Sequence, residues 1–335
     1  MSKLKDNAKI IKRIVMIIVF LLFLAAPFYA DSFSIIMLIR FMYFGLMTIS
    51  FSFLASQLGL ISLMVPVFYA LVAYVIAIFQ TRGIMAVEGS IFVAFIVSMA
   101  FAALAGAMVN RTKAITFLML TLVLAQMTWS IAAVWADLTN GVDGLVGISF
   151  PDWLNVFDTG ITNFNQFYWT FLLFSTTAGL VWLLTKSPYG LILRGIRESE
   201  TRMKALGYNT ALLKWSAFMI AAYVSSVGGL LYIHFMGMVT PEVLTLGASN
   251  QPLISSILGG INSVFAGPMI GTIIYLTLDL ILSGIIRRYA IIVGLIMLFV
   301  ILFTPNGLIA ILDSNMGKKV RELFTKRKGG NDNVC

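Results

Sequence analysis

Two ionisable side chains, Arg40 and Asp279, lie inside stretches of sequence that are otherwise almost wholly apolar. A charged group in the hydrocarbon core of a membrane is costly, so such residues usually pair with one another or line the pathway of a polar solute or ion. Arg40 and Asp279 can pair with each other, and the sequence alone assigns them no further role. A carrier driven by a proton or sodium gradient usually has more groups of this kind, together with two repeated halves. No internal repeat is evident here, which weakens that interpretation without excluding it.

Small, polar and helix-breaking residues form a second group that could take part in a solute pathway. They are Gly59, Ser62, Thr121 and Gln126, and the cluster of Gly259, Gly260, Ser263, Gly267 and Pro268. Glycines also let helix backbones approach closely in lipid, so close packing is the alternative for each of them. Irregular backbone at membrane depth is buried in protein or lines a cavity, so the two roles are compatible for the cluster.

The motifs of common catalytic, nucleotide-binding and metal sites are missing from the sequence. It has no G-x-x-x-x-G-K-[ST] phosphate loop, no H-E-x-x-H pair and no G-x-S-x-G turn. A single histidine, His234, cannot form a metal site by itself, and a packing or interfacial role is the better interpretation. The single cysteine, Cys335, excludes an intramolecular disulfide. We therefore expect no catalytic residues, no metal and no cofactor bound by this chain, and a transport protein or channel rather than an enzyme.

The elements that must position these residues are membrane-spanning helices. Hydrophobic residues make up 60% of the sequence and charged residues 11%, whereas a soluble domain has about 25% charged residues. A β-barrel would show short alternating segments instead of long apolar runs. The sequence predicts an all-α polytopic membrane protein with about ten transmembrane helices, one of them short. The expected spans are residues 14–30, 34–54, 61–79, 90–109, 114–136, 168–184, 215–235, 251–263, 267–282 and 290–308.

The distribution of basic residues predicts the orientation of these spans. The N-terminus (1–13), the charged stretch 186–214 and the tail (313–335) are all basic, so all three should lie in the cytoplasm. Nine clear spans would leave the tail outside, which requires one more crossing after residue 235. The only apolar segment left is 251–263, which is short and should be surrounded by protein. Residues 14–312 would then be the transmembrane domain, and the basic residues need no nucleic-acid partner to explain them.

The first apolar segment has an alternative interpretation as a cleaved signal peptide. Its cleavage pattern is poor, because Phe28 occupies a position where a small residue is wanted before Ala30. We therefore expect a retained first span that follows a cytoplasmic N-terminus.

The charged stretch 186–214 interrupts the apolar chain and has helical periodicity. Its apolar residues at helical spacing are Tyr189, Ile192, Leu193, Ile196, Met203 and Leu206. Two pairs have the acid first at i,i+4: Glu198–Arg202 and Glu200–Lys204. Gly207 supplies a stop, and Asn209 or Thr210 can cap the next helix. This pattern favours a short amphipathic surface helix that contacts another protein, and an ordinary solvated loop is the alternative.

The longest segment expected outside the cytoplasm is 137–167. It is rich in Gly, Asn and Asp, which is typical of turns, and it is acidic. Trp153, Tyr168 and Trp169 fit an aromatic belt at the membrane surface. Such a loop could dock a soluble partner, and a plain connector is the alternative.

Several of these segments together resemble one family. The sequence SPYGLILRGIRESETRMKALGYNTALLKWSAF is similar to the cytoplasmic loop of branched-chain amino acid ABC-transporter permeases of the LivM type. The segment from Thr139 to Leu145 resembles the T-x-G-x-D-G-L motif of that family. Other matching positions, in the same order as in the family, are Pro241-Glu242, Gly259-Gly260, Ser263, Gly267-Pro268, Gly271, Pro305 and Gly307-Leu308.

The resemblance implies the permease fold of an ABC importer. It implies that the stretch 186–214 holds a coupling helix, which would dock in a groove of a cytoplasmic ATP-binding subunit. The residues that would carry this coupling are Gly190, Arg194, Arg197, Glu198, Ala205, Leu206 and Gly207. ATP would act through those partner subunits only. A second homologous permease, an extracytoplasmic solute-binding protein and membrane lipid are the other implied partners.

The resemblance also implies a bacterial inner-membrane protein with both termini in the cytoplasm, and branched-chain amino acids as the first candidate solute. The sequence departs from the family between Gly59 and Val65, where G-Q-L-S-L-G-H is usual and only Gly59, Ser62 and Leu63 are kept. Urea, amides or another small solute are therefore alternatives. A solitary ion-coupled carrier or channel is the alternative from a different class, and the sequence does not distinguish a homodimeric from a heterodimeric pore.

Overall fold

The computed structural model describes residues 23–29, 31–110, 112, 114–148, 151, 164–285, 291–292 and 294–295. The regular secondary structure of the described part is helical, apart from two strands of two residues each. The helices are α2 Ala26–Tyr29, α3 Ser32–Leu58, α4 Val65–Thr81, α5 Val87–Val109, α6 Ala114–Val134, α7 Ala136–Thr139, α8 Phe164–Lys186, α9 Pro188–Glu198, α10 Glu200–Ala205, α11 Thr210–Met236, α12 Leu246–Gly259 and α13 Ala266–Ile285. The 3₁₀ turns η1 and η3 are Gly141–Asp143 and Pro241–Leu244, and the strands β1 and β2 are Leu145–Val146 and Met238–Val239.

Six of the described helices are long and apolar enough to cross a membrane: α3, α5, α6, α8, α11 and α13. Helix α4 is a shorter apolar helix of 17 residues. The chain is therefore a multi-pass helical membrane protein. Most of the expected tenth span (290–308) and of the first (14–30) lies outside the described residues, as do the N-terminus (1–13) and the tail (313–335). The count of ten therefore stays a prediction.

Two helix starts differ from those expected. The third span was placed from residue 61, but Gly59 adopts a left-handed conformation (φ 68°) and α4 begins only at Val65, with Pro66 in its first turn. The short helix was placed from residue 251, but α12 begins at Leu246. The Thr245 hydroxyl accepts a hydrogen bond from the backbone N–H of Ala248 (3.3 Å) and so caps α12 early.

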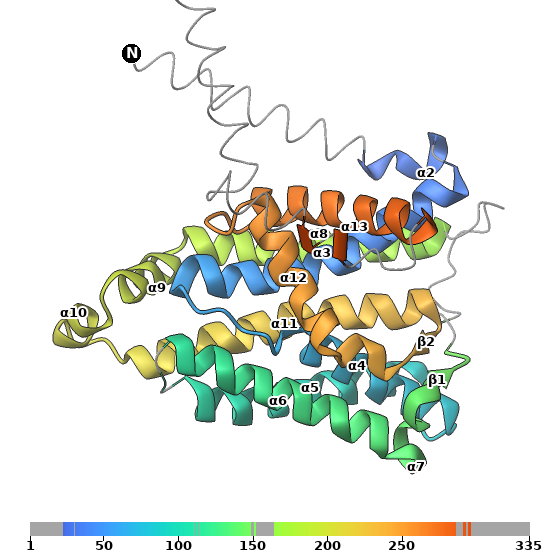
Figure 1. Cartoon of the computed structure of the whole chain (residues 1–335), viewed down its shortest axis with the longest axis horizontal. Coiled ribbons are helices and arrows are strands. Elements are labelled where there is room, and N and C mark those ends of the chain that lie inside the picture. The colour runs from blue at the N-terminus through green and yellow to red at the C-terminus, as the bar shows by residue number, and fades with distance from the viewer. Residues whose placement is uncertain are drawn as a thin grey trace, which may run out of the picture.

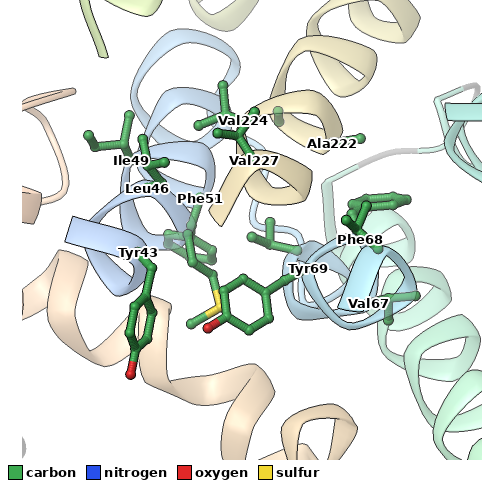
Figure 2. Close-up of a cluster of buried hydrophobic side chains, with 14 of the residues drawn as sticks. Tyr43, Leu46, Ile49, Phe51, Val67, Phe68, Tyr69, Ala222, Val224 and Val227 are labelled. Atoms are coloured by element: carbon green, nitrogen blue, oxygen red, sulfur yellow. The ribbon is translucent and has the colours of Figure 1, made fainter. Parts of the chain in front are cut away.

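Helices α3, α4 and α11 form the centre of the bundle. Figure 2 shows side chains from all three in one apolar cluster, among them Leu46 of α3, Phe68 of α4 and Val224 of α11. Gly229 of α11 lies so close to α4 that an added Cβ would overlap the backbone carbonyl of Tyr69. Close approach of this kind is what small residues provide where lipid gives no hydrophobic drive for helix association.

Serine hydroxyls join the central helices across their interfaces. Ser50 of α3 donates to the carbonyl of Ala221 on α11 (2.6 Å), and Ser225 of α11 donates to the carbonyl of Val65 on α4 (2.6 Å). Interhelical hydrogen bonds of this kind contribute on average about 0.6 kcal/mol each in membrane proteins. They fix the relative rotation of α3, α4 and α11 as well as their distance.

The bundle has two ends with different irregular structure (Figure 1). Helices α9 and α10 project at one end, and α7, β1 and β2 lie at the other. At the second end β1 pairs antiparallel with β2, so Leu145 lies opposite Val239. We call these the α9 end and the ribbon end. Between Met238 and Asn262 the chain returns from the ribbon end to the α9 end through α12, whose 14 residues rise about 21 Å.

Candidate functional site

The charged stretch 186–214 forms two short helices rather than the one expected. Ser199 is extended (φ −160°, ψ 99°) and ends α9 after Glu198, and its hydroxyl accepts from the N–H of Arg202 to cap α10. The predicted pair of Glu198 with Arg202 is therefore wrong as a helical i,i+4 pair, because the break lies between them. Met203 of α10 packs against Gly195 of α9, which folds the two helices together.

Glu200 ties this segment to the start of α11. Its carboxylate is 2.5 Å from the ammonium of the buried Lys214, 3.0 Å from that of Lys204, and accepts from the Thr210 hydroxyl (3.2 Å). Burial acts to raise the pKa of Glu200, but the hydrogen bonds from Lys214 and Lys204 outweigh it and lower the pKa from 4.5 to about 2. The expected Glu200–Lys204 pair is thus confirmed. Asn209 is confirmed as the cap of α11, accepting from the N–H of Leu212 (3.2 Å).

Gly190 and Arg194 hold α9 against the end of α8. An added Cβ on Gly190 would overlap the carbonyl of Thr185, so no larger residue fits without a shift of backbone. The guanidinium of Arg194 lies 3.4 Å from the same carbonyl, which is one of the unpaired acceptors at the C-terminus of α8. The angle between α8 and α9 is therefore set by these two residues.

Arg197 joins α9 to two other elements at the same end of the bundle. Its Nη1 donates to the carbonyl of Ser56 at the C-terminal end of α3 (2.6 Å). Its Nη2 donates to Oδ1 of Asn262 in the turn between α12 and α13 (3.3 Å). Its side chain also covers Gly59, where an added Cβ would lie 3.2 Å from Cγ of Arg197. A movement of α9 would therefore act on α3 and on the α12–α13 turn together.

The outer side of the α9–α10 segment is exposed. Glu198, Ala205 and Gly207 are exposed, and Gly207 adopts the left-handed conformation (φ 86°) that ends α10, as expected. Leu206 was expected on the apolar face of a helix, but α10 ends before it, and 71% of the residue is exposed. Leu191 and Leu212 are also largely exposed, so this end of the molecule presents apolar side chains among basic ones.

The predicted pathway cluster lies in the tight turn between α12 and α13. An added Cβ on Gly259 would overlap the carbonyl of Gly267, and the Ser263 hydroxyl accepts from the N–H of Gly267 (2.6 Å). Gly260 has φ 124° and ends α12, while Pro268 is buried in the first turn of α13. These residues let the two helices pack closely. Whether they also line a pathway stays a prediction.

The other predicted pathway residues lie between α4 and α6. Ser62 is buried in the connection before α4, and its hydroxyl accepts from the N–H of Met64 (3.3 Å). The Thr121 hydroxyl of α6 accepts from the N–H of Leu63 (3.3 Å) and so holds this connection. The buried Nε2 of Gln126, one turn further along α6, has no hydrogen-bond partner among the described residues. Ser62 and Thr121 therefore lie close together, and whether they line a pathway stays a prediction.

A separate cavity of about 320 Å³ lies nearer the ribbon end and contains Arg40 and Asp279. Nη2 of Arg40 on α3 lies 3.0 Å from Oδ2 of Asp279 on α13, which confirms that the two residues pair. The side chain of Arg40 is 31% exposed and that of Asp279 15% exposed, so both reach the cavity surface. The pair links α3 to α13, and its two residues are 239 positions apart in sequence.

The walls of the cavity come from six segments of the chain. Tyr43 and Tyr69 bring phenol rings from α3 and α4, and Tyr232 brings one from α11, with its ring centroid 5.1 Å from that of Tyr69. Phe44 of α3 stacks on Tyr275 of α13 (centroids 5.6 Å apart, planes at 6°) and forms an apolar wall. Sequence reasoning missed these rings. A signal was present, because Tyr43 and Tyr275 lie one helical turn from Arg40 and Asp279.

The ribbon end borders this cavity and is held by the T-N-G-V-D-G-L segment. Asn140 has φ 62°, and its side-chain amide donates to the carbonyl of Gly144 (3.0 Å). An added Cβ on Gly144 would overlap the carbonyl of Val239, so glycine is required where the segment meets β2. The residues after β2, including Thr240 and Glu242, line the cavity. The remainder of the expected external loop, at 149–150 and 152–163, lies outside the described residues.

Comparison with known proteins gives a consistent result. Residues 34–303 match the model of a family described as the permease component of branched-chain amino acid transport systems. A probable branched-chain amino acid transport permease protein LivM from Methanocaldococcus jannaschii is 28% identical, over 56% of this chain and 59% of the relative. High-affinity branched-chain amino acid transport system permease proteins LivM from Salmonella typhimurium and Escherichia coli are each 28% identical, over 38% of this chain and 29% of the relative. The matches thus span less than two thirds of these relatives. No solved structure matches significantly.

Proposed function

We propose, from the premise that this chain belongs to the branched-chain amino acid transport permease family, that it is the membrane-spanning permease subunit of an ATP-driven importer. It translocates a small polar solute, and branched-chain amino acids are the first candidate. The observation that carries the proposal is the position of Arg197, which connects the exposed α9–α10 segment to both α3 and the α12–α13 turn.

The α9–α10 segment is the coupling element in this proposal. Its outer surface, with Glu198, Ala205 and Leu206, meets a groove on a cytoplasmic ATP-binding subunit. Gly190, Arg194 and Arg197 fix α9 to the bundle, and Gly207 sets the turn into α11. When ATP brings two such subunits together, α9 is displaced, and its hydrogen bonds carry that displacement into the bundle.

The orientation and assembly follow from this assignment. The α9 end faces the cytoplasm of a bacterial cell and the ribbon end faces outward, with both termini inside. The short helix α12 provides the extra crossing, and the return of the chain between Met238 and Asn262 supports it. A second homologous permease completes the pore, an extracytoplasmic binding protein delivers the solute at the ribbon end, and ATP is bound by the partner subunits alone.

The solute is the least constrained part of the proposal. The connection between Gly59 and Val65 departs from the family pattern, and it packs against Thr121 of α6. If this connection faces the solute, then urea, amides or another small solute become better candidates than branched-chain amino acids. An ion-coupled carrier working alone is the candidate from another class, and the intramembrane pair of Arg40 and Asp279 is the feature that would favour it.

The test is uptake of radiolabelled leucine into proteoliposomes that contain the permease pair and its ATP-binding subunits. We expect uptake that requires ATP and stops when the ATP-binding subunits are inactivated. Reversal of two charges, Arg197→Glu with Glu198→Arg, should lower uptake while the amount of permease in the membrane is unchanged. Uptake by the permease alone under an ion gradient would show that the protein is an ion-coupled carrier and not part of an ATP-driven importer. Unchanged uptake in the double variant would contradict the coupling role of α9.

A further inference from the structure

We infer that the cavity between α3, α11, α12 and α13 is a binding site for a zwitterionic solute, with Arg40 recognising the carboxylate and Asp279 the ammonium group. The inference rests on the proposed function, because it names a station for the imported solute. It goes further in assigning the site to residues of this chain and in defining the solute by an ammonium group and a carboxylate attached to the same carbon.

The ion pair has unused hydrogen-bonding capacity that faces the cavity. A guanidinium has five N–H donors and a carboxylate has about four acceptor positions. The contact between Arg40 and Asp279 uses Nη2 of one and Oδ2 of the other. Since both side chains are partly exposed to the cavity, a solute carboxylate can bind a second edge of the guanidinium, and an ammonium group can bind the other carboxylate oxygen.

The alternative is that the pair only fastens α3 to α13. A buried ion pair is weak evidence for stability, because desolvation offsets most of the attraction. Elsewhere α13 is fastened by close packing, as where Gly271 meets the carbonyl of Ser255 on α12. A charged pair at the edge of a cavity, rather than inside packed apolar side chains, is suited to exchange partners with a solute of matching charges.

The rest of the cavity fits a small solute with an apolar side chain. Its volume of about 320 Å³ is at the small end of the roughly 300–1,000 Å³ usual for small-molecule sites. Phe44, Met47 and Leu276 supply apolar surface on the same side as the ion pair, while Tyr232 and Gln251 add polar groups. A site of this composition would hold the two charges of an amino acid at the ion pair and its side chain against the apolar wall.

The position of the cavity suits a solute that arrives from the ribbon end. Met238, Thr240 and Glu242, which directly follow or belong to β2, line it. These residues pair with or adjoin the segment that the proposed binding protein would contact. For the solute to leave toward the cytoplasm, α12 and α13 would then have to move. Arg197 contacts the turn that connects these two helices.

The test measures equilibrium binding of radiolabelled leucine to the full chain in nanodiscs, with two competitors that each lack one charge. 4-Methylpentanoate lacks the ammonium group and 3-methylbutylamine lacks the carboxylate. In the unaltered protein we expect each to compete roughly 10- to 100-fold less well than leucine, the effect of losing one charge-assisted hydrogen-bond set. This measurement requires no variant to fold. Equal competition by either analogue, or no binding of leucine, would overturn the site.

Three variants separate recognition from fastening. Asp279→Asn should weaken leucine binding about 10- to 100-fold and leave 4-methylpentanoate binding nearly unchanged, while Arg40→Gln should do the same with 3-methylbutylamine as the retained ligand. Each single variant leaves one charge without its partner, and the double variant removes both charges and therefore leaves no unpaired charge. If the pair only fastens helices, the double variant should bind leucine like the unaltered protein, and that result would overturn the inference.

The outcome is distinguishable from failure of the proposed function. ATP-dependent uptake that persists in the double variant at an unchanged half-saturating leucine concentration would overturn this site and leave the importer intact. Leucine binding that depends on both charges, in a protein whose uptake needs no ATP, would support the site and overturn the importer.

Discussion

At the scale of single residues, the arginines of α9 have different tasks although their spacing in sequence is regular. Arg194 contacts only its own neighbourhood, the carbonyl of Thr185 at the end of α8. Arg197 spans to α3 and to the α12–α13 turn, with its two terminal nitrogens directed to two acceptors. A planar guanidinium can make both contacts at once, whereas a lysine ammonium on a flexible stem cannot reproduce this geometry.

Arg197→Lys should therefore uncouple the permease while keeping the charge. We expect leucine uptake per ATP hydrolysed to fall about tenfold, the effect of losing a hydrogen bond to a charged group. Arg202→Lys on the neighbouring helix α10, where the side chain is exposed, is the matched control and should change this ratio less than twofold. The measurement is parallel uptake and phosphate release in proteoliposomes, and equal ratios in both variants would contradict the role of Arg197.

Glu200 should make the α9–α10 segment sensitive to acid. Its pKa in the folded protein is about 2, against 4.5 for the free group, so its contribution to stability is complete above pH 4.5 and is lost as the pH falls toward 2. Its carboxylate is 37% exposed, which limits the contribution to about 1 kcal/mol. The protection factors of the α10 amides, which are exchange rates corrected for the intrinsic pH dependence of exchange, should fall between pH 5 and pH 3.

Glu200→Gln should remove that dependence and leave the protection factors low at every pH, because Lys214 loses its partner. The exposed Glu198→Gln is the control and should behave like the unaltered protein. A pH profile in Glu200→Gln that matched the unaltered protein would show that another group titrates.

At the scale of elements, the membrane helices were predictable and their ends were not. Long apolar runs with few charges identified α3, α5, α6, α8, α11 and α13, because hydrophobic length alone is enough to recognise a span. The break at Ser199 was missed, because the apolar periodicity continues from Ile196 to Met203 across it and hides a serine that caps a new helix. The start of α4 was missed because Gly59 ends α3 in a left-handed turn within an apolar sequence.

The candidate site was predictable only in part. Arg40 and Asp279 were found, since charges inside apolar runs are conspicuous, and their pairing was expected. Of the four tyrosines that line the cavity, none was found, because phenol rings are equally common in packed helices and at membrane surfaces. The convergence of Tyr43, Tyr69 and Tyr232 depends on the crossing of α3, α4 and α11 at Gly228 and Gly229, which is a tertiary property.

That crossing should be intolerant of one added methyl group. Gly229→Ala places a Cβ against the carbonyl of Tyr69, and overpacking of this kind should destabilise the protein by about 1–3 kcal/mol. Gly179→Ala on α8 is the control, because nothing lies within 4 Å of the added Cβ, and helix propensity should make it neutral or stabilising by about 0.5–1 kcal/mol. Thermal unfolding in detergent measures the difference, and equal midpoints for the two variants would contradict the close crossing.

At the scale of the whole molecule, a buried core of α3, α4 and α11 is surrounded by helices that expose much of their length. At each end of the bundle one feature joins parts of the chain that are distant in sequence, Arg197 at one end and the β1–β2 ribbon at the other. The cavity lies toward the ribbon end and the exposed α9–α10 segment at the α9 end. The proposed cycle needs these two ends on opposite sides of the membrane.

Cysteine labelling tests that orientation. With Cys335 replaced by serine, Met85→Cys and Val142→Cys at the ribbon end should react with a membrane-impermeant maleimide added outside cells. Leu206→Cys, at a position that is also exposed, should react only after the cells are permeabilised. Labelling of Leu206→Cys from outside intact cells would show that the orientation is the reverse of the proposed one, in which case a cytoplasmic ATP-binding subunit could not reach α9.

The ion pair between Arg40 and Asp279 also has a consequence for how the protein is made. The two residues are 239 positions apart, which at about 5–20 residues per second corresponds to roughly 12–48 s of translation. During that interval α3 has left the ribosome and Arg40 has no counter-ion from α13. The newly inserted helix must keep this arginine near the lipid headgroups by extending its long side chain. Biogenesis is then complete only when α13 arrives and draws the arginine inward.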